Sequence, residues 1–246
     1  MIIIPAIDLQ NGRCVRLEQG QFDRVSIYEK DPMNLAANYT QAGATHLHLV
    51  DLDGAKKGSM QQLELIKGLT AEGLSLQVGG GIRDFETALA CLDAGIERIV
   101  LGSIAISNPK ETITIIQEAK PQRVILALDV RIEETLPNIV IHGWQTATKH
   151  SLWERVSFYQ DWGIDTILCT DVTRDGMLSG PNIALYEEAL SRFPTIQWQA
   201  SAGVRDREDL KKLSRVGVAA AILGRVLYDP HFNLKAAIES EKQSRR

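Results

Sequence analysis

Two aspartates stand directly after apolar runs in the two halves of the chain, and both are candidates for acid–base chemistry. Asp8 follows IPAI, and Asp129 follows ILAL. A carboxylate accepts a proton at neutral pH, and it donates one when burial or a nearby negative charge raises its pKa. An aspartate alone after a strand is more often a turn residue or a helix cap. The matching positions of these two in the halves favour a pair that faces one ligand from both sides.

A longer stretch also occurs twice. GGGIRDFETALACLDAGIERIVLGS, from Gly79, aligns without gaps on SAGVRDREDLKKLSRVGVAAAILGR, from Ser201. Each copy has a glycine turn, a helix that begins at an aspartate, an apolar strand and a second glycine. Glycines let backbone N–H groups approach an anion closely, and a helix N-terminus favours negative charge. The repeat therefore predicts two phosphate sites, and a ligand with a phosphate at each end.

Short apolar runs alternate with amphipathic stretches along the whole chain. The runs predict strands at 2–7, 46–50, 76–78, 98–101, 124–128, 166–169, 196–199 and 219–223. The stretches predict helices near 34–41, 60–71, 85–94, 110–119, 152–162, 183–191, 207–215 and 233–240. Eight β/α units favour an α/β fold, an eight-stranded parallel TIM barrel with a two-fold internal repeat. We expect one domain, 1–246, made of half-barrels 1–120 and 121–246, because no linker composition separates them.

Two intervals are longer than a barrel needs. Segments 9–30 and 130–150 follow the first and fifth strands, and the second contains IVIHGW, which is typical of a small hairpin strand. Loops at the carboxyl ends of barrel strands carry lids and substrate contacts. Both emerge beside a strand-terminal aspartate, which favours a functional role over that of a solvated insertion.

The composition excludes several classes of partner. With 27 basic and 31 acidic residues, the net charge is -4, which argues against nucleic acid and anionic membranes. Three dispersed cysteines fit a reducing compartment, and we expect a cytoplasmic protein. The opening apolar run is interrupted by Pro5 and Asp8, which is typical of a strand and not of a signal peptide.

HLH at His46 to His48 is the main alternative motif, because alternate histidines on a strand share a face and can hold a metal. These histidines begin their strand, however, whereas barrel chemistry lies at the strand's carboxyl end. We therefore expect a structural role for them, and neither a metal nor a cofactor.

Nine motifs, in order, resemble the phosphoribosylformimino-aminoimidazole carboxamide ribotide isomerases of histidine biosynthesis. They are IIIPAIDL, VRLEQG, LHLVDLDGAK, VGGGIR, LGS, LALDVR, GW, CTDVTRDGMLSGPN and LGR, and the match covers residues 2–238. The resemblance implies an Amadori rearrangement of an aminoaldose that has two phosphoribosyl ends, with Asp8 as the proton acceptor and Asp129 as the proton donor. It places the phosphate loops on Gly81, Gly102, Ser103, Gly203, Gly224 and Arg225.

The resemblance implies further substrate contacts. Trp144 would stack on the imidazole, although a half-buried tryptophan without function explains HGWQ equally well. Thr170, Asp171 and Asp175 match polar positions near the substrate, with Asp175 a candidate to share the acid's work, but DG pairs are also common in turns. Arg16 and Arg83 match phosphate or carboxamide contacts, or they are solvated arginines.

Two positions depart from the family pattern. Ala202 replaces the second glycine of SGG, and Met177 follows RDG where a threonine is usual. An alanine fits the loop with a negative φ, so we expect the phosphate site to survive. Met177 puts a hydroxyl contact in doubt.

Two alternative functions remain. The sister cyclase of the same pathway also has two strand-end aspartates and two phosphate loops, but VRLEQG and TDVTRDGMLSGPN resemble the isomerase. A non-catalytic sensor of phosphorylated metabolites would not need both Asp8 and Asp129. We expect a monomer whose partner is a small molecule with two phosphate groups.

Overall fold

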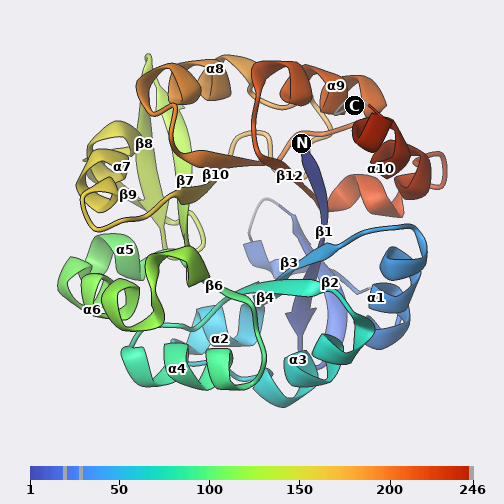
Figure 1. The fold of residues 1–246 in the computed structure, drawn as a ribbon, viewed down its shortest axis with the longest axis horizontal. Helices are drawn as coiled ribbons and strands as arrows, with labels where there is room; N and C mark the ends of the chain where they lie inside the picture. The colour runs from blue at the N-terminus through green and yellow to red at the C-terminus, as the bar shows by residue number, and fades with distance from the viewer. Residues whose placement is uncertain (19–20, 28–29, 244–246) are drawn as a thin grey trace.

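Eight parallel strands form a closed barrel in this computed structural model, which describes residues 1–18, 21–27 and 30–243, and no side chain between 16 and 29 (Figure 1). The barrel strands are β1 (Ile2–Gln10), β4 (His46–Asp51), β5 (Ser75–Gly79), β6 (Arg98–Leu101), β7 (Val124–Glu133), β10 (Thr166–Asp171), β11 (Gln197–Ser201) and β12 (Ala220–Leu223). They pair in that order, and the pairing of β12 with β1 closes the ring. The TIM barrel and all eight predicted strands are confirmed.

Helices surround the barrel and connect its strands (Figure 1). Their bounds are α1 (Pro32–Gln41), α2 (Leu52–Lys57), α3 (Leu63–Leu69), α4 (Phe85–Asp93), α5 (Ile104–Ser107), α6 (Pro109–Ala119), α7 (Leu152–Gln160), α8 (Ile183–Arg192), α9 (Arg207–Val216) and α10 (Leu234–Gln243). Short 3₁₀ segments are η1 (Thr70–Glu72), η2 (Pro121–Arg123) and η3 (Arg225–Tyr228). None of the helices in the described ranges is long and apolar enough to cross a membrane.

The repeated helices α4 and α9 begin at the repeated aspartates. The Asp84 carboxylate accepts a hydrogen bond from the Thr87 N–H at 2.7 Å, and that of Asp206 accepts one from the Asp209 N–H at 3.0 Å. Such caps satisfy backbone donors that the first helical turn leaves unpaired. The repeat in the sequence is therefore a repeat in structure.

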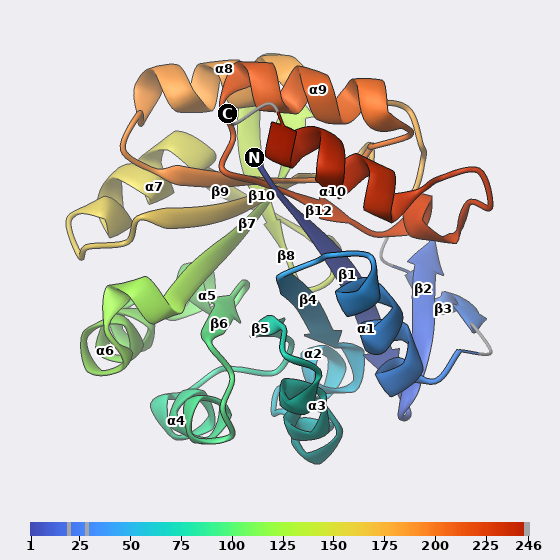
Figure 2. The same ribbon diagram turned by 45° about the vertical axis from the view of Figure 1, so that its right-hand side comes forward.

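Two antiparallel hairpins extend the barrel at the carboxyl ends of β1 and β7. β2 (Arg13–Glu18) and β3 (Gln21–Ile27) follow β1, whereas β8 (Leu136–Ile141) and β9 (Thr146–Ser151) follow β7 (Figure 2). The hairpin in 130–150 was predicted, but the one after β1 was not. Each hairpin directly follows, along the chain, one of the strands that carry Asp8 and Asp129.

The barrel interior has an apolar layer and a polar layer. The apolar layer consists of Ile4, Val100, Ile125, Leu168, Ala220 and Ile222. Beneath the cavity, Gln77 Nε2 donates to Gln199 Oε1 at 2.9 Å, and Gln199 Nε2 donates to Gln77 Oε1 at 3.1 Å. The two glutamines are 122 residues apart, which is the offset of the sequence repeat. Their reciprocal pairing marks the pseudo-two-fold axis of the barrel.

Candidate active site

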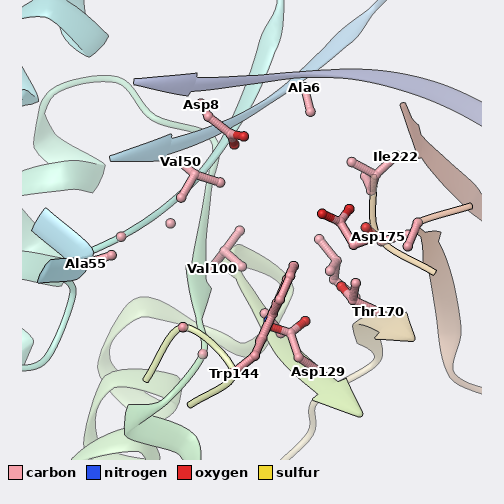
Figure 3. Close-up of a pocket in the computed structure, with 18 of the residues that line it drawn as sticks. Ala6, Asp8, Val50, Ala55, Val100, Asp129, Trp144, Thr170, Asp175 and Ile222 are labelled. Atoms are coloured by element: carbon pink, nitrogen blue, oxygen red, sulfur yellow. The ribbon is translucent and has the colours of Figure 1, made fainter. Parts of the chain in front are cut away.

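The carboxyl ends of the barrel strands surround a cavity of about 670 Å³. Asp8 from β1, Asp129 from β7 and Asp175 from the turn after β10 line it. β1 and β7 stand four places apart in the ring of eight strands, so Asp8 and Asp129 approach from opposite sides. Figure 3 shows the three carboxylates pointing into the same space from different directions. A ligand that fills the cavity lies between them.

Asp129 is buried among hydrogen-bond donors and a second carboxylate. Trp144 Nε1 donates to its Oδ2 at 2.8 Å, and the Thr170 side chain makes a second hydrogen bond to it. Burial raises the pKa of Asp129 above its ordinary value, the Trp144 and Thr170 hydrogen bonds oppose this rise, and the negative charge of Asp175 adds to it. Because the net direction is upward, Asp129 holds a proton more readily than an exposed aspartate does.

Trp144 reaches Asp129 from a tight turn between β8 and β9. His142, Gly143 and Trp144 have φ values of 57°, 64° and 67°, so two residues with side chains adopt the left-handed conformation. That conformation is unfavourable for them and needs support from the surroundings. The His142 N–H donates to Ser103 Oγ at 3.1 Å, so the turn is held against the loop after β6. The tryptophan ring thereby stands in the cavity (Figure 3).

Gly81 and Gly102, which follow β5 and β6, line the cavity. Their repeat counterparts Gly203 and Gly224, which follow β11 and β12, line it as well. Gly81 has φ 82° and Gly203 has φ 83°, and a Cβ on either would collide with backbone. At Gly81 that Cβ would lie 2.7 Å from the carbonyl carbon of Ser59. At Gly102, by contrast, the nearest atom would lie 3.9 Å away. Gly81 and Gly203 are therefore required by the neighbouring loops, whereas Gly102 leaves backbone open to the cavity.

Ala202 does not have the negative φ that the sequence led us to expect. Its φ is 79°, and its repeat counterpart Gly80 has φ 99°. The loop keeps the same left-handed conformation in both halves, because the adjoining strands fix its path, and the alanine adopts it at a cost of about 1–3 kcal/mol. Met177, the other departure from the pattern, is exposed and lies outside the cavity lining.

The candidate arginines make different contacts. Arg83 lines the cavity, and its Nη2 donates to the Ala55 carbonyl at 3.1 Å. Arg225 also lines the cavity, and its guanidinium donates to the Gly176 carbonyl. Both side chains therefore bind neighbouring backbone in this structure. The side chain of Arg16 lies outside the described residues.

Asp171 does not line the cavity. Its Oδ1 accepts from the Thr173 N–H at 3.1 Å and from the Thr173 hydroxyl at 2.7 Å, and its Oδ2 accepts from Asn182 at 2.8 Å. Asp171 is buried and anchors the turn after β10. Asp51, at the end of β4, anchors the following turn in a similar way, because its Oδ1 accepts from the Gly54 N–H. This placement does not support the substrate contact that the resemblance implied.

His48 lies on the cavity floor, which we had not expected from the HLH motif. Its Nδ1 lies 3.0 Å from Gln77 Nε2, and it is buried. Burial lowers the pKa of His48 from 6.5 to about 4, so the imidazole is neutral at neutral pH and contributes no charge to the cavity. The described residues contain no group of three His, Cys, Asp or Glu side chains placed to hold a metal ion.

Comparison with known proteins shows to which protein family this barrel belongs. The model of the family described as histidine biosynthesis protein matches residues 2–233, which is most of the chain. The chain belongs to the histidine biosynthesis protein family.

Relatives in this family share close to the full length of the chain. A protein of Legionella pneumophila strain Philadelphia 1 is 52% identical over 235 residues, which cover 96% of this chain and 98% of the relative. Proteins of Francisella philomiragia and Proteus mirabilis are 44% and 43% identical, over 97% and 96% of this chain and 100% and 98% of the relatives. All three are named 1-(5-phosphoribosyl)-5-((5-phosphoribosylamino)methylideneamino)imidazole-4-carboxamide isomerase.

Proposed function

We propose that this member of the histidine biosynthesis protein family is an isomerase. Its substrate is the aminoaldose N'-(5'-phosphoribosyl)formimino-5-aminoimidazole-4-carboxamide ribonucleotide, which it rearranges to the aminoketose. The observation that carries the proposal is the placement of Asp8 and Asp129 on opposite strands of one cavity, between two repeated pairs of glycine loops. The names of relatives up to 52% identical support the same substrate.

The chemistry needs one acid and one base. Protonation of the sugar ring oxygen opens the ring and gives an iminium at carbon 1. Removal of the proton on carbon 2 then gives an enolamine, and transfer of the enol proton to carbon 1 completes the aminoketose. Each proton transfer requires a group within hydrogen-bond distance of the atom that it serves. Carboxylates on opposite walls of one cavity can supply an acid and a base to the same ligand.

We assign the acid role to Asp129 and the base role to Asp8. The raised pKa of Asp129 supports the first assignment, because it increases the protonated fraction of the free enzyme. Once the proton has left, the Trp144 N–H and the Thr170 side chain stabilise the new carboxylate. Asp175 lines the same cavity and shares the acid's work.

The two glycine-loop pairs suit a ligand with two phosphate ends. Gly102 and Ser103 lie on one side of the cavity, and Gly203, Gly224 and the backbone of Arg225 on the other. The face of the Trp144 ring suits stacking on the flat imidazole. We further propose that the enzyme works as a monomer without a cofactor, since one chain supplies all these groups. The three dispersed cysteines support a reducing, cytoplasmic compartment.

A turnover assay tests the proposal. The purified protein is incubated with the aminoaldose, and the aminoketose is measured, with phosphoribosyl anthranilate as a parallel substrate. We expect aminoketose to form. Tight binding without turnover would instead support the sensor, and consumption of aminoketose with ammonia would support the cyclase.

A further inference from the structure

The turn that carries Asp175 is well anchored at its two ends. At its start, Asp171 is buried and hydrogen-bonded within the turn. At its end, the Gly180 N–H donates to the Gly203 carbonyl at 2.9 Å, which joins the turn to the loop after β11. Asp175 lies between these anchors, near the exposed tip. The Arg174 side chain ties the turn together from within, since its Nη1 donates to the Gly180 carbonyl at 2.9 Å. A catalytic carboxylate at such a tip must also be held relative to the loops around it.

Arg225 supplies a contact at this tip. Its guanidinium donates to the carbonyl of Gly176, the residue directly after Asp175. Gly176 has φ 69°, a left-handed conformation that bends the chain at this point. Arg225 is the first residue of η3, after β12, so the contact bridges two loops that are distant in sequence. The hydrogen bond fixes the backbone beside Asp175.

The first half of the barrel has a corresponding contact, made by a different arginine. There Arg83 donates to the Ala55 carbonyl, in the segment after β4, which is the repeat counterpart of the segment after β10. Arg205 aligns with Arg83, but its Nε and Nη2 bind the Asp209 carboxylate at 2.8 Å each. In the second half, Arg225 makes the contact that Arg205 does not.

We propose that Arg225 is a positioning residue for Asp175, and that its side chain is not a phosphate ligand. The inference rests on the proposed isomerase activity, in which Asp175 acts beside Asp129. The Arg225 guanidinium holds the Gly176 peptide, and that peptide sets the direction of the Asp175 side chain. The backbone after β12 remains free to bind phosphate, since this contact uses only the arginine side chain.

A double-mutant cycle separates the two roles of Arg225. Arg225→Met keeps much of the side chain's length and removes its donors. We expect kcat to fall on the order of tenfold to a hundredfold, as for a displacement of about 1 Å, with little change in KM. Because both changes remove the same contribution, Arg225→Met with Asp175→Asn should be no slower than Asp175→Asn alone. Arg225→Lys, which restores a donor and the charge, should recover part of kcat.

Arg83→Met is the matched control, because it removes the other arginine–carbonyl contact. Its effect on kcat/KM should multiply with that of Asp175→Asn. Urea unfolding of each variant checks that the barrel is intact, which we expect because Arg225 is exposed.

Three results would overturn the proposal while the wild type still turns over. They are a rise in KM with unchanged kcat in Arg225→Met, multiplicative effects of Arg225→Met and Asp175→Asn, and a normal kcat in Asp175→Asn. The first outcome would assign the side chain to phosphate, the second would mean that Arg225 acts independently of Asp175, and the third would remove Asp175 from the chemistry. An inactive wild type would instead contradict the isomerase activity itself.

Discussion

Replacing Trp144 by phenylalanine should raise the pKa of Asp129 further. The indole N–H donates to Asp129 Oδ2 at 2.8 Å, and phenylalanine keeps an aromatic face but has no donor. A hydrogen bond to a charged group contributes about 1.5–3 kcal/mol, and one pKa unit corresponds to about 1.4 kcal/mol. Water that enters the vacated space recovers part of this energy. We therefore expect a rise of about one pKa unit.

The pH dependence of kcat/KM measures this change, because it reports the ionisation of the free enzyme. An acid must be protonated to act, so the loss of activity at high pH follows the pKa of Asp129. In Trp144→Phe this limb should move to higher pH by about one unit. Thr170→Val, which removes the second hydrogen bond to Asp129, should move the same limb in the same direction.

The reasoning fails if the high-pH limb of Trp144→Phe stays in place or moves to lower pH. A shift of the low-pH limb instead would mean that Asp129 must be ionised to act. In that case Asp129 would be the base, and the two aspartates would exchange the roles that we assign to them.

Three further predictions concern stability and binding. Asp129→Asn should raise the free energy of unfolding more at pH 7 than near pH 3.5. An aspartate whose pKa is raised by folding stabilises the fold at low pH, and this contribution is lost as the pH rises through the folded pKa. Asparagine does not titrate and therefore does not lose it. An equal effect at both pH values would contradict the raised pKa. Ala202→Gly should stabilise the protein by about 1 kcal/mol in urea unfolding, since it relieves a left-handed alanine, and a loss of stability would refute the strain. Gly81→Ala should destabilise the fold, whereas Gly102→Ala should leave the unfolding midpoint near that of the wild type and weaken substrate binding. If the two substitutions changed the unfolding midpoint and substrate binding to similar extents, that result would count against a phosphate role for Gly102.

The sequence predicted the barrel well, because each strand is a short apolar run between amphipathic helices. The strand ends were less predictable. β1 continues to Gln10 and β7 to Glu133 because β2 and β8 pair with their extensions. The β2–β3 hairpin was missed because its alternating apolar and polar runs, Val15 to Glu18 and Val25 to Ile27, are only about three to four residues long.

The sequence also placed most of the candidate site, because a repeat in a barrel brings equivalent positions to one face. Asp8 and Asp129 were expected from the repeat and Trp144 from the family resemblance, and all three line the cavity. It could not show the positive φ of Ala202, which depends on the path that the adjoining strands impose. Nor could it show that Arg225 binds backbone, because that contact joins two loops far apart in the chain.

Paired aspartate substitutions test the central claim most directly. Asp8→Asn and Asp129→Asn are each compared with the wild type for substrate binding and for turnover of the aminoaldose. We predict that both variants bind substrate but lose turnover by at least the roughly 10² to 10⁴ that one acid–base group contributes. Near-normal turnover in either variant would contradict the assignment of acid and base to opposite walls of the cavity.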